Sequence, residues 1–168
     1  SFKPLMEKER EKVIEPAIHP KDGPLLMGEV VNAVAEVTDG NAILVTDVGQ
    51  NQLFATRYFK YPNKRSICTS GGLGTMGYGM PAAIGATFGA PGRTVVSFSG
   101  DGGFQMNMQE MATAMTEKIP VVICLFNNAN LGMVRQMQQL FYGKRYEITD
   151  LISRSEEPRV GKECRSRW

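Results

Sequence analysis

The chain has 168 residues, of which 42% are hydrophobic and 21% are charged, and its net charge is +2. This composition is typical of one globular domain with a single core, and so small a charge without a long basic stripe excludes a dedicated nucleic-acid surface. No apolar run approaches the roughly 20 residues that cross a bilayer, and the charged, proline-containing leader does not resemble a secretory signal. We therefore expect neither nucleic acid nor a membrane as a partner.

The three cysteines and the single histidine do not form a catalytic centre. Cys68, Cys124 and Cys164 make no CxxC pair. Cys68 and Cys124 lie in apolar, strand-like runs, so they are predicted to be reduced core residues. His19 stands alone in the charged leader, which argues against a zinc site or a Ser-His-Asp triad. Any chemistry must come from other residue types.

Helices and short apolar strands are predicted to alternate from Gly23 onward. The leader, residues 1–22, carries prolines and mixed charges without apolar periodicity, and we interpret it as an extended arm or interdomain linker. Helices are predicted over 25–37, after Gly49-Gln50, near 81–88, over 107–116 and over 131–142. Strands of the buried type are predicted over 42–48, 65–69, 94–98 and 120–126.

This alternation predicts the fold class. Continuous apolar strands separated by helices are typical of an α/β fold, here a doubly wound, mostly parallel sheet with helices on both faces. We expect it to form one domain over residues 23–152. Residues 153–168 are dense in charge and almost without apolar side chains, which predicts a disordered or non-native tail.

Three polar or glycine-rich segments follow predicted strands: Val48–Asn51, Gly100–Gly103 and Asn127–Asn130. In an open α/β sheet, ligands bind outside the carboxyl ends of the strands. Glycines in the second segment let the backbone turn tightly and approach an anion, and the helix after it offers free N–H groups. All three segments are therefore candidates for one binding site.

A carboxylate and an amide in these segments are suited to a metal diphosphate. Asp101 supplies a hard oxygen beside the anion position, and Asn128, at the end of the next strand, supplies an amide oxygen; Mg²⁺ is commonly held by such groups together with phosphate oxygens. Taken singly, Asp-Gly after a strand is an ordinary turn and Asn-Asn an ordinary helix N-cap. The helix and strand between them favour the metal-site interpretation.

These residues resemble a known family. Gly-Asp-Gly at 100–102, followed by residues 103–126 and then Asn-Asn, resembles the motif of thiamine-diphosphate enzymes. Longer strings look like the large catalytic subunit of acetolactate synthase: SGGLGTMGYGMPAAIGA (70–86), GDGGFQMNMQEMATA (100–114) and LGMVRQMQQLFY (131–142). The resemblance covers about residues 22–150. The closing strand and helix of the family's domain are expected to be missing after Asp150.

The resemblance implies a role for each matching position. Asp101, the side chain of Asn128 and the backbone carbonyl of Asn130 correspond to the Mg²⁺ ligands. Met76, after Gly74, corresponds to the apolar residue that holds the cofactor in its bent V shape. The remaining cofactor positions are Val48, Gly49, Gln50 and Asn51 in one loop, Gly100, Gly102 and Gly103 beside the diphosphate, and Leu131, Gly132 and Met133 along the cleft.

Other interpretations and two departures accompany these roles. Met76 could fill a gap in the core, and Met133 and Met137 could form the apolar face of an ordinary helix. Asn51 stands where the family usually has His, which weakens a proton-handling role for that loop. Met137 stands where the family usually has Trp, which puts substrate preference in doubt.

The implied activity is the transferase reaction of acetolactate synthase, a carboligation of two pyruvates to 2-acetolactate and CO₂ in branched-chain amino acid biosynthesis. The implied cofactors are thiamine diphosphate and Mg²⁺; FAD is usual in the full-length family enzyme. The family's catalytic Glu lies in a different domain, so this chain is expected to be inactive alone. The partners implied are a second copy of the enzyme, in a homodimer or higher homo-oligomer, 2-keto acid substrates and a regulatory small subunit. The compartment implied is the cytoplasm of a bacterium or an organelle of a eukaryote.

Three alternatives stay open at this level. Another thiamine-diphosphate-dependent 2-keto acid decarboxylase or carboligase would share the motifs. A nicotinamide-binding Rossmann domain would use Gly72, Gly74 and Gly77 as its G-x-G-x-x-G, with Asp101 as the ribose-binding acid. An assembly module that has lost the chemistry would bind no cofactor.

Overall fold

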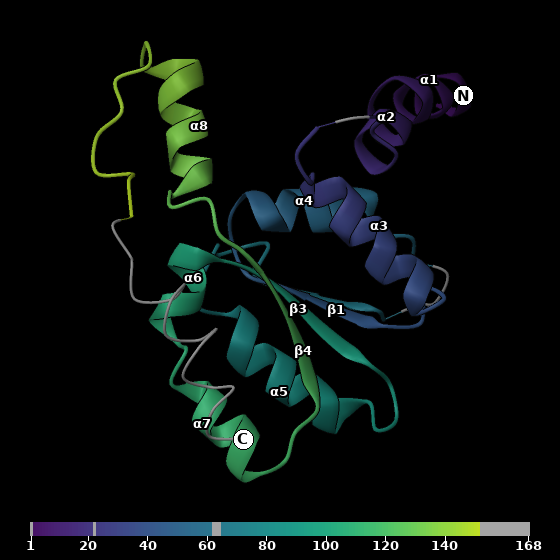
Figure 1. Ribbon diagram of the computed structural model, residues 1–168, viewed down its shortest axis with the longest axis vertical. Coiled ribbons are helices and arrows are strands. Elements are labelled where there is room, and N and C mark those ends of the chain that lie inside the picture. The colour runs from purple at the N-terminus through teal and green to yellow at the C-terminus, as the bar shows by residue number, and fades with distance from the viewer. Residues whose placement is uncertain (1, 22, 62–64, 152–168) are drawn as a thin grey trace. The chain divides into compact units, whose positions relative to one another are not determined.

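The computed structural model describes residues 2–21, 23–61 and 65–151 (Figure 1). The predicted tail at 153–168, with Cys164, lies outside the described residues. Two compact units make up the chain, residues 1–126 and residues 127–168. No helix of the described residues is long and apolar enough to cross a membrane.

The first unit is built on a parallel four-stranded sheet in the order β2-β1-β3-β4. Its strands are β1 (Ile43–Thr46), β2 (Ile67–Thr69), β3 (Val95–Gly100) and β4 (Val121–Phe126). Thr46 pairs with both Thr69 and Phe98, and Gly100 pairs with Phe126. The carboxyl ends of the strands therefore lie along one edge of the sheet.

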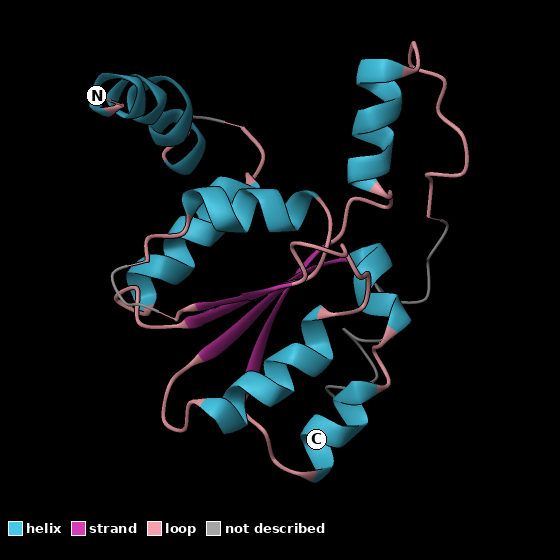
Figure 2. Cartoon of the chain, turned by 180° about the vertical axis from the view of Figure 1, so that it is seen from behind, coloured by secondary structure: helices cyan, strands magenta, loops and turns pink. Residues whose placement is uncertain are grey.

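Helices cover both faces of the sheet, as Figures 1 and 2 show. The helices α3 (Met27–Val37) and α4 (Gln50–Tyr58) lie on one face. On the other lie α5 (Gly79–Gly89), α6 (Asp101–Met106) and α7 (Glu110–Thr116). The predicted doubly wound α/β class is confirmed. The helix predicted over 107–116 corresponds to α7, which is shorter, and the short helix α6, which begins directly at Asp101, was not predicted.

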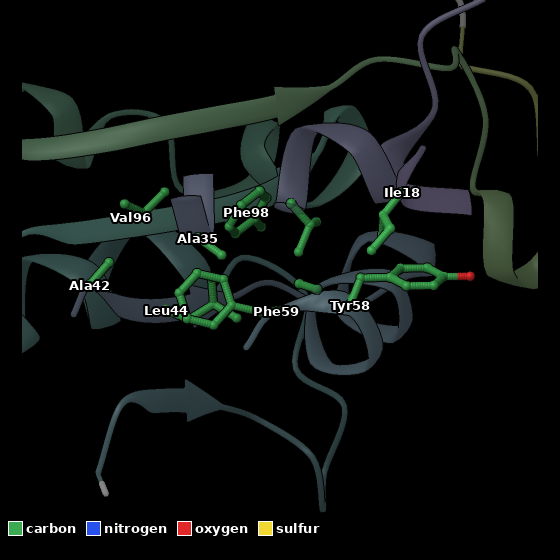
Figure 3. Packing of buried hydrophobic residues seen from close by; sticks show 10 residues of the cluster. Ile18, Ala35, Ala42, Leu44, Tyr58, Phe59, Val96 and Phe98 are labelled. Atoms are coloured by element: carbon green, nitrogen blue, oxygen red, sulfur yellow. The ribbon is translucent and has the colours of Figure 1, made fainter. Parts of the chain in front are cut away.

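Alternate residues of each central strand enter two apolar clusters. Leu44, Val96 and Phe98 point toward α3 and α4 (Figure 3), where the Phe98 ring stacks on Phe126 with 5.6 Å between ring centroids. Their neighbours Ile43, Val45 and Val95 pack against α5 on the opposite face. A strand buried on both faces needs apolar side chains at consecutive positions, which explains the unbroken β-branched runs in the sequence.

The leader is helical, so the prediction of an extended arm is wrong. It forms α1 (Lys3–Glu9), the π-helix η1 (Arg10–Ile14) and α2 (Glu15–Ile18). Pro4 and Pro16 each occupy a first helical turn, where no N–H donor is required. The Glu15 N–H donates to the Arg10 carbonyl in the wide turn before Pro16. Ile18 is buried in the cluster beneath α3 (Figure 3), and this packing stabilises the helical leader.

The strand β4 is only partly covered, although its sequence predicts a fully buried strand. Val122 is 50% exposed and Leu125 is 39% exposed. β4 is the edge of the sheet, and no strand of the described residues pairs with its outer side. Cys124 on this strand is a half-buried free thiol, and burial raises its pKa. Cys68 is likewise free and half-buried, in agreement with the predicted reduced cysteines.

The second unit consists of a turn, the helix α8 (Gly132–Phe141) and a returning segment. Asn130 and Asp150 form an antiparallel bridge. The Leu131 N–H donates to the Thr149 carbonyl, and the Leu151 N–H donates to the Ala129 carbonyl, each at 2.8 Å. The returning segment is thereby fixed to the turn that precedes α8.

Candidate functional site

A polar residue follows each strand directly at the carboxyl edge of the sheet. Asp47 follows β1, Ser70 follows β2, Asp101 follows β3 and Asn127 follows β4. Because the ends of parallel strands share one edge, the three predicted segments all begin there. Within the first unit the structure brings the loops after β1, β2 and β3 into contact, as the hydrogen bonds described next demonstrate.

The glycine-rich loop between β2 and α5 is held in one conformation. The Gly74 N–H donates to the Ser70 carbonyl at 2.9 Å, and the Thr75 N–H donates to the Ser70 hydroxyl at 3.1 Å. Gly74 and Gly77 have φ of +63° and +84°, a left-handed conformation that side chains disfavour. Met76, half-buried, lies between these two glycines. The glycines therefore fix where the Met76 side chain leaves the backbone.

Asp47 is the central side chain of the edge, and the motifs did not identify it. It is 1% exposed, its Oδ1 accepts the Gly77 N–H at 3.1 Å, and its Oδ2 accepts the Gly79 N–H at 2.8 Å. A Cβ at Gly103 would lie 2.5 Å from Asp47 Oδ1, so the first turn of α6 packs directly on this carboxylate. The glycine at 103 thus has a structural reason besides the predicted approach to an anion.

Asn107 is a second residue that the sequence did not reveal. Its Nδ2 donates to the Gly77 carbonyl at 2.8 Å. The backbone of Gly77 is consequently held at its N–H by Asp47 and at its C=O by Asn107. The only sequence signal was a polar residue inside a segment assigned to a helix face, which is too common to indicate a role.

Asn51 joins the ends of two strands. It is 4% exposed, and its Nδ2 donates to the Asp47 carbonyl at 2.9 Å and the Phe98 carbonyl at 3.0 Å. Both of its donor hydrogens are therefore used inside the protein. The rest of the predicted loop, Val48–Gln50, is half-buried. Gly49 has φ of +135°, and a Cβ there would meet Asn51 Oδ1 at 2.6 Å.

Asp101 is the predicted metal ligand of the first unit. It is 3% exposed and is the first residue of α6. Its Oδ1 accepts the Gly102 N–H at 3.0 Å. The neighbours Gly102 and Gly103 lie in the first helical turn, where N–H groups have no carbonyl partner within the helix. Backbone donors and a buried carboxylate therefore occur side by side at this strand end.

Asn128 and Asn130 form one compact turn in the second unit. The Asn130 N–H donates to Asn128 Oδ1 at 3.0 Å, and Asn130 Nδ2 donates to the Asn128 carbonyl at 2.7 Å. Arg135 donates to Asn130 Oδ1 at 3.2 Å and pairs with Asp150 at 2.7 Å. The last predicted residues follow this turn, with Leu131 as the N-cap of α8 and Gly132 and Met133 in its first turn.

The predicted ligand atoms are one carboxylate, one amide oxygen and one backbone carbonyl. Such hard oxygen donors fit Mg²⁺, which takes its remaining ligands from phosphate and water. The described residues contain no group of three or more His, Cys, Asp or Glu side chains that could hold a metal, so an all-protein metal cage is not among them. Asp101 belongs to the first unit and the two asparagines to the second.

The sheet order contradicts the Rossmann alternative. In that fold the acidic residue follows the strand adjacent to the one before the glycine-rich turn. Here the glycine-rich loop follows β2, while Asp101 follows β3, and β1 lies between these strands.

Comparison with known proteins decides the family. The sequence model described as thiamine pyrophosphate enzyme, C-terminal TPP binding domain, matches residues 47–159. The chain belongs to this family. The match begins at Asp47 and includes the glycine-rich loop, Asp101 and the asparagine turn.

Curated relatives of the chain carry the name acetolactate synthase. The isozyme 1 large subunit of Escherichia coli K12 is 52% identical over 119 residues, which are 71% of this chain and 21% of that protein. The large subunit IlvB1 of Mycobacterium tuberculosis is 48% identical over 134 residues, 80% of this chain and 22% of that protein. Chloroplastic acetolactate synthase 1 of Nicotiana tabacum is 48% identical over 130 residues, 77% and 20% respectively. The chain thus spans about a fifth of these relatives.

Proposed function

We propose that this chain is the Mg²⁺- and diphosphate-binding part of an acetolactate synthase, a carboligase that converts two pyruvates to 2-acetolactate and CO₂ in branched-chain amino acid biosynthesis. The observation that supports it best is the carboxyl edge of the sheet. There the buried Asp101 and the glycine-rich loop carrying Met76 are held in fixed conformations. The names of the relatives favour this activity over other thiamine-diphosphate-dependent decarboxylases and carboligases.

The proposal gives each segment a task. Asp101, the Asn128 side chain and the Asn130 carbonyl hold Mg²⁺, and the Gly102 and Gly103 backbone lies against the diphosphate. Met76 supports the organic part of the cofactor, with the loop Val48–Asn51 and residues 131–133 beside it. When bound, thiamine diphosphate supplies the electron sink for the carbanion chemistry. The protein supplies orientation.

Asn51, in the loop after β1, is not suited to proton transfer. Both Asn51 donor hydrogens are bonded to carbonyls, and an amide does not titrate. The proposal therefore assigns proton transfer at the cofactor to a Glu of another domain, and it expects no turnover by this chain alone. In this proposal the full-length enzyme is a homodimer or larger assembly that acts on 2-keto acids and binds FAD and a regulatory small subunit. Its compartment is the bacterial cytoplasm or a eukaryotic organelle.

Calorimetric titration of the 168-residue chain with thiamine diphosphate tests the proposal. Binding is expected with Mg²⁺, is lost with a chelator, and is lost in Asp101→Asn, which keeps the side-chain size but removes the charged ligand. Asp39→Asn is the matched control, because Asp39 is exposed and distant in sequence. Binding of NAD without metal, or metal-independent binding of thiamine diphosphate, would contradict the proposed function.

A further inference from the structure

The least expected feature of the edge is a fully buried carboxylate that belongs to none of the predicted ligand sets. Asp47 is 1% exposed. Among the described residues it accepts hydrogen bonds from the backbone N–H groups of Val48 at 2.8 Å, Gly77 at 3.1 Å and Gly79 at 2.8 Å. Burying a carboxylate is costly unless it is fully hydrogen-bonded, so these three donors are what permits Asp47 to lie here.

We propose that Asp47 is a positioning residue, which sets the binding of the organic half of thiamine diphosphate through Met76 and leaves the diphosphate half unaffected. This inference rests on the proposed function. It assigns Asp47 no contact with the cofactor or metal. Asp47 acts on the loop conformation alone.

The loop geometry explains how one side chain controls Met76. Gly77 directly follows Met76, and its N–H and C=O are held by Asp47 and Asn107 at 3.1 Å and 2.8 Å. Gly79, the first residue of α5, is held by the second Asp47 oxygen. Two anchors at Gly77 and Gly79 fix the direction in which the chain leaves Met76.

The site requires a carboxylate of this length. Asp47 offers a separate oxygen to Gly77 and to Gly79, whereas an amide offers one oxygen and would turn its NH₂ toward the other N–H. Gly103 and Gly79 lie directly against this carboxylate, because a Cβ at Gly103 would lie 2.5 Å from Oδ1 and one at Gly79 would lie 3.1 Å from Oδ2. Asp47→Asn therefore changes the hydrogen bonding without changing the packing.

The diphosphate side packs against Asp47 at Gly103 but does not share its hydrogen bonds. Asp101 bonds to the Gly102 N–H, and none of the hydrogen bonds recorded for Asp47 among the described residues goes to Gly102 or Gly103. An isosteric change at Asp47 should therefore leave the groups proposed for Mg²⁺ and the diphosphate in place.

Amide hydrogen exchange on the ligand-free 168-residue chain tests the anchor itself. In Asp47→Asn, exchange at Gly77 and Gly79 should accelerate about tenfold or more, since a hydrogen bond to a charged group is lost. Exchange in β1 and β3 should not change, nor should any of these amides respond to the control Asp39→Asn. Unchanged exchange at Gly77 and Gly79, or acceleration throughout the sheet, would overturn the proposal.

Binding measurements with two ligands then distinguish a positioning role of Asp47 from a general loss of structure. The affinity of Asp47→Asn for thiamine diphosphate with Mg²⁺ should fall about tenfold or more, while its affinity for methylenediphosphonate with Mg²⁺ stays within about twofold of the unmodified chain. Equal losses for both ligands, or no loss for either, overturn the inference. If the unmodified chain binds neither ligand, the proposed function fails and the cofactor part of this inference fails with it, whereas the exchange result still reports on the anchor.

Discussion

Replacing Asn51 by Ala should destabilise the first unit by an amount that the structure allows to be worked out. The side chain is buried and donates two hydrogen bonds, to the Asp47 carbonyl at 2.9 Å and the Phe98 carbonyl at 3.0 Å. Each is worth about 1 kcal/mol net, so both together give about 2 kcal/mol. The Phe98 carbonyl keeps the Asp47 N–H at 2.9 Å, which prevents a larger loss.

Urea unfolding followed by circular dichroism measures this change in the free energy of unfolding, and thermal unfolding measures the corresponding change in Tm. For a chain of this size, a loss of about 2 kcal/mol lowers Tm by about 4–8 °C. Thr56→Ala is the matched control on the same helix, because its exposed hydroxyl only bonds carbonyls of its own helix, at Gln52 and Leu53. It should change the stability by less than about 0.5 kcal/mol. If Asn51→Ala costs no more than Thr56→Ala, the assignment of Asn51 as a bridge between strand ends is refuted.

Two further measurements follow from the described side chains. Burial raises the pKa of Tyr61 to about 12 from an ordinary value of 10.0. Absorbance at 295 nm should therefore show a transition near pH 12 that Tyr61→Phe removes. The contribution of this phenol to the stability of the fold is complete below pH 10 and is lost as the pH rises toward 12. Arg135→Met should lower the free energy of unfolding by less than about 1 kcal/mol, because its partner Asp150 is 73% exposed. Amide exchange at Leu131 and Leu151 should nevertheless accelerate. Unchanged exchange at these two residues would contradict the role of Arg135 in fixing the asparagine turn.

The strand and helix pattern was predictable because each strand is an apolar run that ends at a polar residue. The leader was not, because prolines are read as breakers, whereas Pro4 and Pro16 start helical turns and Ile18 is stabilised by tertiary packing. The exposure of Val122 could not be predicted from the sequence either. An apolar run is the same in a central and in an edge strand, and only the sheet order distinguishes them.

The site residues likewise include some that the sequence indicates and some that only the structure reveals. Asp101 was recognisable because its glycine neighbours form a motif, but Asp47 stands inside an apolar run and reads as the end of a strand. Its partners Gly77 and Gly79 are 30 and 32 positions away in the chain, so only the folded structure reveals the anchor. The roles of the individual site residues and the domain limits 23–152 stay predictions, to be tested by the binding experiments.

The exposed outer side of β4 affects how the chain behaves in solution. Unpaired N–H and C=O groups along an edge strand form a template for another strand, and the half-exposed Val122 and Leu125 add apolar surface to it. No proline interrupts β4, and none of its side chains is charged, so the usual protections against edge-to-edge pairing are missing from this strand. We therefore expect self-association that grows with protein concentration, and we expect Val122→Lys to suppress it.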